Sequence, residues 1–245
     1  MVKKTILFKR ILVFGILVLF IGAGIVPSIV GMRKQKTSIP SIVSPGYIQD
    51  LIDNASDGDT INIPSGTYYE NIVINKSISL IGEDKEKTII DGGNNGTVIR
   101  ISINKVTVSG FTIQNGDDGI GLYRSNRTSI IGNIISNNGD GIYLNGCSGN
   151  NIKYNIISNN GDGIILSHNG YIVIIKNNFQ DNKRDAFFYN SYLNLWWRNY
   201  WNKSRILPKL IHGEIILSSG GWGLPRIWIP WFNIDWRPAL TLNDI

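Results

Sequence analysis

The chain of 245 residues carries 24 Lys and Arg residues against 18 Asp and Glu residues, a formal charge of +6, and 42% of its residues are hydrophobic. This basic balance would fit a nucleic-acid-binding protein, but seven of the cations and no acid lie in residues 1–36. The rest of the chain has 17 cations against 18 acids, so it lacks the basic surface that binds phosphate backbones. We therefore expect no nucleic-acid partner.

The N-terminal cations precede an uncharged apolar stretch, ILVFGILVLFIGAGIVPSIVG, at residues 11–31. This order is typical of a secretory signal, and about 20 apolar residues also suffice to span a bilayer. Residues 1–31 are therefore interpreted as a signal peptide or an N-terminal membrane anchor, and both alternatives stay open because no clear A-x-A cleavage site follows. Either one leaves the body of the protein outside the cytoplasm, secreted or membrane-anchored at the cell surface. Residues 32–43 are interpreted as a linker.

A short amphipathic helix is expected in SPGYIQDLIDNA, residues 44–55. Ser44 and Pro45 fit an N-cap and a first helical position, and apolar residues follow at helical spacing from Ile48 to Ala55. Such a helix can cover the unpaired backbone groups and exposed core at the open end of a β-structure. We interpret it as an N-terminal cap.

Short alternating β-branched segments begin at residue 59, and a 22-residue period becomes strict further along. The stretch IISNNGDGI, for example, occurs at 134–142 and at 156–164. Three segments per unit without a helical pattern favour one coil of a parallel β-helix, with equivalent residues stacked about 4.8 Å apart. Apolar columns would fill the interior, and Asn columns would lie at bends with their amides paired. The columns are Ile113, Ile135, Ile157 and Phe179; Ile120, Ile142, Ile164 and Ala186; Leu122, Leu144, Leu166 and Phe188; Asn133, Asn155 and Asn177; and Asn115, Asn137 and Asn159, continued by Asp181.

The fold prediction is therefore an all-β protein, a right-handed single-stranded parallel β-helix of about six coils that occupies residues 44–202 with its N-terminal cap. The stretch from residue 194 breaks the period and contains all seven Trp residues. Because the terminal units of a solenoid are usually atypical, we interpret residues 203–245 as a Trp-rich C-terminal cap. The alternative is an aromatic surface that stacks on sugar rings.

Much of the chain, from about residue 47 to 200, resembles the right-handed parallel β-helix family of carbohydrate-binding proteins and sugar hydrolases, and within it the NosD-type β-helix repeat. That family includes lyases, hydrolases, accessory proteins and non-catalytic surface proteins, so the resemblance implies the fold more strongly than the function. The resemblance is carried by DGDTINIPSGTYYENIVINKSISLIGE at 57–83, VTVSGFTIQN at 106–115, and the N-x-I-I-S-N-N-G-D-G-I-x-L units at 133–144 and 155–166, while the tail at 230–245 resembles tails on exported archaeal β-helix proteins.

A column of carboxylates is the first candidate site. Asp118, Asp140 and Asp162 occupy the same position of three successive repeats, with Asp117 beside the first and Arg184 one coil beyond the last. Stacked carboxylates could act as catalytic groups or supply oxygens to a weak Ca²⁺ site. However, Asp-Gly is also common in turns, and two exposed carboxylates about 4.8 Å apart repel by only about 1 kcal/mol in water. We favour the turn with a local ion pair and assign no catalytic residue beyond these candidates.

The hydrolase and copper functions that the resemblance implies receive little support from the residues. The hydrolase elements DD and HG occur at 117–118 and 212–213, nearly a hundred residues apart. Copper sites favour His, Cys and Met, but His168 and Cys147 fall in neighbouring coils without sharing a column. We therefore expect no resident cofactor apart from the weak Ca²⁺ candidate.

An outward-facing strip is the second candidate site. Tyr143, Ile165 and Phe187 share one column, and Tyr123 and Tyr189 share the next. An exposed aromatic and aliphatic strip is unusual on a soluble protein. We interpret it either as a platform for stacking on a glycan or as a bed for the Trp-rich tail, and we favour the bed because the tail follows these coils directly.

The function expected from these observations is a non-catalytic, exported or cell-surface module that binds a polysaccharide, a cell-surface glycan or a protein partner. A polysaccharide lyase or glycoside hydrolase acting at the Asp column is the first alternative. A NosD-like accessory protein for metal-site maturation is the second. The membrane would be a further partner if residues 11–31 are retained.

Overall fold

The computed structural model describes residues 46–217 and 227–245. All of the described residues belong to one compact unit. The predicted signal or anchor (1–31) and linker (32–43) lie outside the described residues. Among the residues that are described, no helix is both long enough and apolar enough to cross a membrane.

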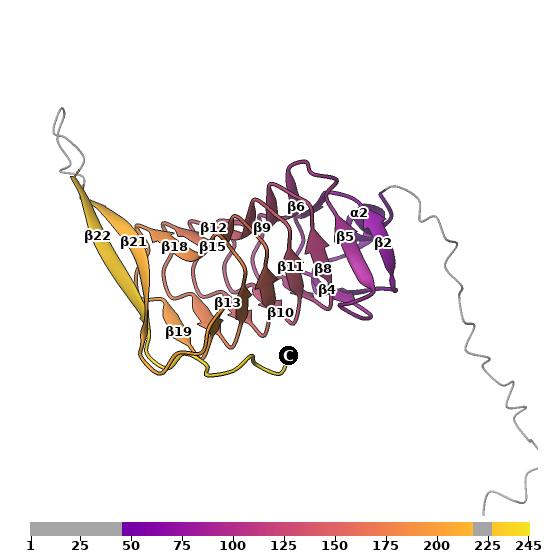
Figure 1. Ribbon diagram of the computed structural model, residues 1–245. Coiled ribbons are helices and arrows are strands. Elements are labelled where there is room, and N and C mark those ends of the chain that lie inside the picture. Colours follow the sequence, from indigo (N-terminus) through magenta and orange to yellow (C-terminus); the bar gives the residue numbers. More distant parts are fainter. Residues whose placement is uncertain (1–45, 218–226) are drawn as a thin grey trace, which may run out of the picture. The chain divides into compact units, whose positions relative to one another are not determined.

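The described chain is a solenoid whose coils each place one strand in each of three parallel sheets (Figure 1). Sheet 1 consists of β1 (Thr60–Ile63), β4 (Ser79–Gly82), β7 (Thr107–Ser109), β10 (Ser129–Ile131), β13 (Asn151–Lys153), β16 (Val173–Ile175) and β19 (Leu195–Trp197). Sheet 2 consists of β2 (Gly66–Tyr69), β5 (Thr88–Asp91), β8 (Thr112–Gln114), β11 (Ile134–Ser136), β14 (Ile156–Ser158), β17 (Asn178–Gln180) and β20 (Tyr200–Trp201). Sheet 3 consists of β3 (Ile72–Ile74), β6 (Thr97–Ile101), β9 (Asp118–Tyr123), β12 (Asp140–Asn145), β15 (Asp162–Ser167) and β18 (Arg184–Tyr189).

The strand pairing confirms the predicted parallel β-helix and its period. In sheet 3, Ile142 pairs with Ile164, its equivalent in the next repeat. Ile142 and Leu144 are fully buried, whereas Tyr143 between them faces outward, as strand alternation requires. The prediction of about six coils was too low, because the strands form seven. The seventh, β19 and β20, was hidden because Trp196 and Trp201 replace the Ile and Phe of the interior columns.

Buried asparagines connect the coils at two bends. The Asn155 N–H donates to Asn177 Oδ1 at 3.0 Å, and Asn155 Nδ2 donates to Ile130 O at 2.9 Å. Each amide thus satisfies a backbone donor and a backbone acceptor of neighbouring coils, which buried peptide groups require. The first ladder was predicted at Asn133, Asn155 and Asn177, and it continues to Asn199.

The second ladder differs from the prediction by one residue. The sequence indicated the column of Asn137 and Asn159, but the amides that pair belong to Asn138, Asn160 and Asn182. Asn137 and Asn159 have φ angles of 58° and 57°, a left-handed conformation that Asn tolerates better than most residues. Their side chains are exposed, whereas those of Asn138 and Asn160 are buried.

The N-terminal end is covered by the predicted helix, α2 (Tyr47–Asn54), with Ile48 and Ile52 fully buried against the first coil. The predicted Ser-Pro cap was wrong, because Gly46 occupies the N-cap position. The buried carboxylate of Glu70 instead accepts hydrogen bonds at 3.1 Å from the backbone N–H groups of Ile48 and Gln49. A carboxylate at a helix N-terminus is favoured by the helix dipole.

The C-terminal end is closed by an antiparallel pair, β21 (Lys209–Leu217) and β22 (Ile227–Asp235), which extends sheets 3 and 1 and joins them. Trp201 stacks on Phe179 with ring centroids 4.5 Å apart. The buried Asp235 accepts hydrogen bonds from the Asn199 N–H and from Trp201 Nε1, each at 3.1 Å. Asp235 thereby takes the place of the next Asn of the first ladder. Since no further coil follows, a residue that only accepts is sufficient there.

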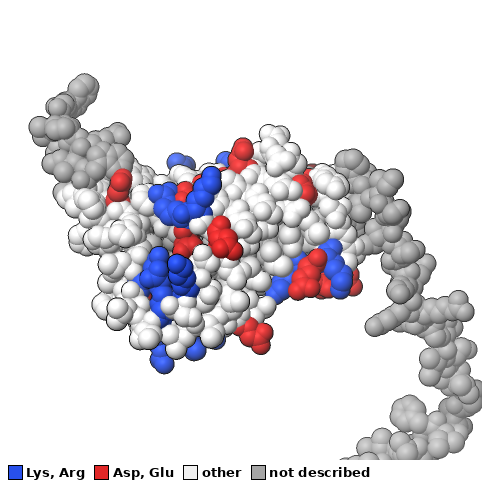
Figure 2. Space-filling model, in the orientation of Figure 1, with Lys and Arg blue, Asp and Glu red and all other residues white. Residues whose placement is uncertain are grey.

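Charge is unevenly divided along the solenoid. Residues 46–170 contain eight cations and 13 acids, whereas residues 171–245 contain nine cations and five acids. In the face shown in Figure 2, Lys and Arg side chains gather over the C-terminal coils. Although the whole sequence has a net positive charge, residues 46–170 are therefore net negative and residues 171–245 are net positive.

Candidate functional site

The outer face of sheet 3 holds the predicted carboxylate column. Asp140 pairs in register with Asp118 on one side and with Asp162 on the other, and Asp162 pairs with Arg184. The constant period therefore brings all four residues into one row along the solenoid axis.

The three stacked carboxylates have different partners. Arg184 binds Asp162 through two contacts, Nε to Oδ1 at 2.6 Å and Nη2 to Oδ2 at 2.7 Å. Asp118 Oδ2 accepts hydrogen bonds from Thr97 Oγ1 at 3.0 Å and from the Tyr123 hydroxyl at 3.3 Å. Asp140, between them, forms no side-chain hydrogen bond with any described residue.

The environment of Asp140 favours its protonated form. Burial, and then the neighbouring charges of Asp118 and Asp162, raise the pKa of the Asp140 carboxyl to about 6, while Arg184 opposes the rise. Desolvation and like charge both disfavour an ionised carboxyl. The column is thus an ion pair at one end, a hydrogen-bonded carboxylate at the other, and an unpartnered carboxyl in the middle.

The outward strip lies on the same face. Tyr143, Ile165 and Phe187 follow one another in register, and Tyr123 and Tyr189 lie in the adjacent column. The prediction of an exposed strip was too strong, because all five side chains are half-buried.

Two arginines cover part of the strip. Arg100 Cζ lies 4.0 Å from the centroid of the Tyr123 ring, and Arg184 Cζ lies 4.2 Å from the centroid of the Phe187 ring. The Tyr123 and Tyr143 rings are tilted against each other at 5.8 Å. Such cation–π and ring contacts are favourable. They leave Tyr143 and Ile165 with no cation above them among the described residues, while the Tyr189 ring contacts the His168 ring at 5.0 Å.

The end of the Trp-rich tail, at residues 239–243, lies away from this strip. Strand β21 of the same segment borders the strip, because Tyr189 pairs with Glu214, so the bed for the tail stays a prediction. The Asn243 N–H donates to Asn178 Oδ1 at 2.9 Å, and Asn243 Nδ2 donates to Arg198 O at 3.1 Å. Ala239 N–H donates to Asn199 O at 2.9 Å. These partners lie at the bend between sheets 1 and 2 of the last coils, and Figure 1 shows the C-terminus running back from the hairpin along the solenoid. The order of the tail in the sequence could not reveal the direction in which it folds back.

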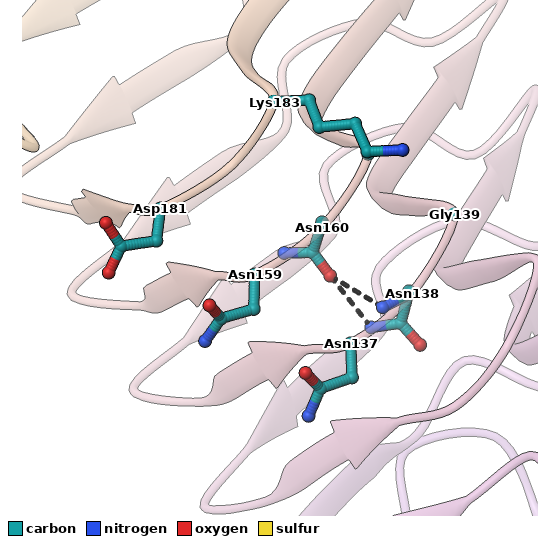
Figure 3. A pocket seen from close by; sticks show the side chains of 8 residues that line it. Asn137, Asn138, Gly139, Asn159, Asn160, Asp181 and Lys183 are labelled. Carbon is teal, nitrogen blue, oxygen red and sulfur yellow. Dashed lines mark hydrogen bonds between the residues drawn. The ribbon is translucent and has the colours of Figure 1, made fainter.

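A shallow polar hollow of about 420 Å³ lies at the bend between sheets 2 and 3 (Figure 3). It is lined by the exposed side chains of Asn137, Asn159 and Asp181, one from each of three successive bends, and by Lys183. The sequence did not identify this hollow, although the repeated Asn-Asn pair signalled it. One Asn of each pair forms the buried ladder, and the other is left facing solvent.

Metal binding has little support from the geometry. The described residues contain no group of three or more His, Cys, Asp and Glu side chains arranged to hold an ion. Asp117 is exposed and accepts a hydrogen bond from the Gly96 N–H at 3.1 Å, so it does not join the column. The Ca²⁺ candidate therefore has no assembled ligand set in this part of the chain.

The donors also do not fit copper. Cys147 is 2% exposed, and burial raises the pKa of its thiol, whereas the thiolate is the form that binds metals. His168 Nδ1 lies 3.0 Å from Ser167 Oγ, and its Nε2 lies 3.2 Å from Asn190 Nδ2. The two residues belong to different positions of neighbouring coils, so the described chain does not bring His and Cys together as a copper site would need.

The strand pairing and this polar, partly aromatic face define a parallel β-solenoid protein. Residues 35–215 match the family model described as "Periplasmic copper-binding protein (NosD)". Because the match covers most of the chain, the protein belongs to the NosD family.

Two further similarities concern the location and the fold. The chain is 38% identical over 84 residues to a "Cell surface glycoprotein" of Methanothermus fervidus, a match that covers 33% of this chain and 14% of that protein. The alginate lyase of Paenibacillus sp. str. FPU-7 shares the fold, with a TM-score of 0.51 and 15% identity over 64% of this chain and 74% of the lyase. The family description and the glycoprotein relative confirm the predicted location outside the cytoplasm or at the cell surface.

Proposed function

We propose that this NosD-family protein is a non-catalytic surface module that binds a glycan along the outer face of sheet 3. The observation that carries the proposal is the unpartnered carboxyl of Asp140, on the same strand as Tyr143, whose half-buried ring has no cation above it among the described residues. Sugars are bound by hydrogen bonds to their hydroxyl groups and by aromatic rings against their apolar faces. Because carboxylates and apolar side chains are stacked over three successive coils of this face, it suits a polymer better than a single sugar.

Charge narrows the class of glycan. The row of Asp118, Asp140 and Asp162 would repel a polyanion at short range, and the nearest cation of the row, Arg184, is held by Asp162. We therefore propose a neutral or amino-substituted polysaccharide as the ligand. A protein partner with exposed hydroxyl and cationic groups is the alternative of the same kind.

A glycan array with the full chain, with and without Ca²⁺, tests the proposal. We expect binding that Tyr143→Ala and Asp140→Asn each weaken by about tenfold, since each removes one kind of contact. Tyr154→Ala is the matched control, because Tyr154 is an exposed tyrosine at the bend between sheets 1 and 2, away from sheet 3. Equal binding by wild type and both sheet 3 variants would contradict the proposed face.

A polysaccharide lyase or hydrolase is the second candidate function, and one observation favours it. The pKa of Asp140 is raised to about 6, which is the range in which a carboxyl can exchange a proton near neutral pH. Ultraviolet absorbance for lyase products and a reducing-sugar assay on neutral and acidic polysaccharides separate the two functions. Turnover that Asp140→Asn abolishes would establish the enzyme, whereas array binding without turnover supports the module.

The described residues of this chain do not form a set of ligands for the copper that the family description names. Their His and Cys side chains are apart, and Cys147 is buried as a protonated thiol. For that reason metal-site maturation is not part of the proposal.

A further inference from the structure

The bend between sheets 3 and 1 carries different kinds of side chain in successive coils, although its backbone conformation stays the same. Arg127, Gly149, Tyr171 and Leu193 occupy equivalent positions of four successive bends between sheets 3 and 1, each one repeat from the next. All four have left-handed φ angles, of 56°, 66°, 58° and 57°. The backbone requirement at this bend is therefore the same in each coil.

Glycine meets that requirement without strain, as Gly149 does, whereas a bulky residue with positive φ is disfavoured. Tyr171 and Leu193 nevertheless occupy the position, and their side chains are 62% and 64% exposed. Neither side chain is there to fill the core. The fold does not need a large apolar side chain at this position, because Gly149 meets the same backbone requirement.

The columns on either side of this position also gain large apolar side chains toward the C-terminal end. Tyr192, 60% exposed, pairs with Gly170, which in turn pairs with Ser148. Leu195, 48% exposed, follows Val173 in register, and Val173 follows Asn151. The last two coils thus replace small and polar residues with large apolar ones. We call this group of exposed side chains the corner patch, which consists of Tyr171, Tyr192, Leu193 and Leu195.

Cations flank the patch along the same bend. Arg124 and Arg127 lie on the bend two coils before Tyr171, and both are exposed. Neither guanidinium forms an ion pair or hydrogen bond with any described residue. A Cβ added at Gly146 would meet Arg124 Cγ at 3.5 Å, and one added at Gly149 would meet Arg127 Cγ at 3.9 Å. Both arginines therefore extend over the next coil, toward the corner patch.

We propose that this bend docks on an anionic lipid surface, with the corner patch in the interfacial region and Arg124 and Arg127 on the headgroups. Tyr and Leu beside unpaired cations are the side chains that bind such interfaces, and each cation near an anionic surface strengthens binding. A bend between two sheets is convex, so it can enter a headgroup layer although it offers a protein partner little area. In a contact between two copies, the like charges of the arginines would oppose association.

A fluorophore that reports polarity, attached in the full chain at Leu193→Cys, tests the proposal. Cys147 is 2% exposed and stays unlabelled in the folded protein. We expect a blue shift with phosphatidylglycerol vesicles, little shift with phosphatidylcholine vesicles, and loss of the shift at high salt, because headgroup attraction is screened. A label at Tyr154→Cys is the matched control, since Tyr154 has a φ of 58° and lies at a different bend.

Two sets of variants measure the contributions separately by vesicle sedimentation. The Tyr171→Gly and Leu193→Gly pair fits the backbone, as Gly149 shows, and we expect it to lower partitioning into phosphatidylglycerol vesicles by about tenfold. The Arg124→Gln and Arg127→Gln pair should lower it by a similar factor and reduce its salt dependence. All of these chains keep residues 11–31, so any contribution of that segment is common to them.

Several results would overturn the proposal. One is an equal shift for the labels at 193 and 154, which would show that the bend is not special. Another is a shift that depends on protein concentration and not on lipid, which would assign the patch to a second copy. A shift with soluble oligosaccharides and none with vesicles would assign it to a glycan.

Discussion

The acidic part of the chain, residues 46–170, and the basic part, residues 171–245, differ in their surfaces. Of the large hydrophobic side chains that are exposed among the described residues, three belong to the first part and twelve to the second. Eight of those twelve lie in the hairpin and tail after residue 202, and four lie in the last coils, which share the backbone of the first part. The first part also has more acids than cations, and the second more cations than acids. Since strand pairing continues across the boundary, the fold does not require the change. A β-solenoid constrains its interior columns and leaves its outer columns free for binding.

The interior columns also differ between the two parts. One column reads Ile113, Ile135 and Ile157 in the regular coils and then Phe179 and Trp201 at the end. The growing side chains fill the last coil, where no following coil would cover a smaller residue. The C-terminal end is thus closed partly by its own core and partly by the hairpin of β21 and β22.

The largest effect should come from breaking the junction between the ladder and the hairpin. Asp235→Ala leaves the Asn199 N–H and Trp201 Nε1 buried without the acceptor they have now. At about 1–3 kcal/mol for each unsatisfied group, we expect the free energy of unfolding to fall by about 4 kcal/mol in urea denaturation. Asp235→Asn keeps an acceptor oxygen, so it should lower the free energy of unfolding by less than Asp235→Ala does. Equal losses would show that the carboxylate does not end the ladder.

A substitution in an asparagine ladder of the regular coils should lower the free energy of unfolding somewhat less than Asp235→Ala does. Asn155→Ala removes the acceptor of the Asn133 N–H and the donor to Ile130 O, and we expect a loss of about 3 kcal/mol. The control is Asn137→Gly, which replaces an exposed residue with positive φ and should leave stability unchanged or slightly raised. If both variants unfold at the same urea concentration, the ladders do not hold the coils together.

The carboxylate column predicts that the free energy of unfolding depends moderately on pH. The folded-state pKa of Asp140 is raised to about 6 from an ordinary value of 3.8, so its ionisation disfavours folding. The associated stability is fully present below about pH 4 and is lost as pH rises through about 6. After allowance for solvent screening at this half-buried site, Asp140→Asn should be more stable than wild type by about 1 kcal/mol at pH 7.5. At pH 4 the two should unfold alike, and a difference that persisted there would point to another cause.

The smallest effect should come from the ion pair that closes the column. Arg184 is 48% exposed and Asp162 is 20% exposed, and pairs near the surface contribute about 0–1 kcal/mol. Arg184→Gln should therefore change the unfolding free energy by less than about 1 kcal/mol. It should also raise the pKa of Asp140 further, because Arg184 is the cation that lowers it. Carbon-detected NMR titration of the carboxyl measures this shift, and an unchanged pKa would contradict the assignment.

The constant repeat length was sufficient to predict the strands, the carboxylate row and one asparagine ladder. Equivalent residues of a parallel solenoid must stack, so Asp118, Asp140 and Asp162 could be aligned from spacing alone. The second ladder was missed because Asn137 and Asn138 repeat with the same period, and only the left-handed backbone at Asn137 selects which amide points inward. The seventh coil was missed because its interior residues are Trp where earlier coils have Ile or Phe.

The sequence by itself determined the architecture of this protein, because alternation and a constant period leave one way to bury the apolar columns. The tertiary structure decided which polar groups remain free. It paired Asp162 with Arg184 and left Asp140 without a hydrogen-bond partner, and it took the end of the tail, at residues 239–243, away from the strip of Tyr143 and Ile165. It also placed Tyr171 and Leu193 on a strained, exposed bend where the preceding coil has Gly149. These outcomes depend on backbone dihedral angles and on contacts between distant segments, which residue spacing does not encode.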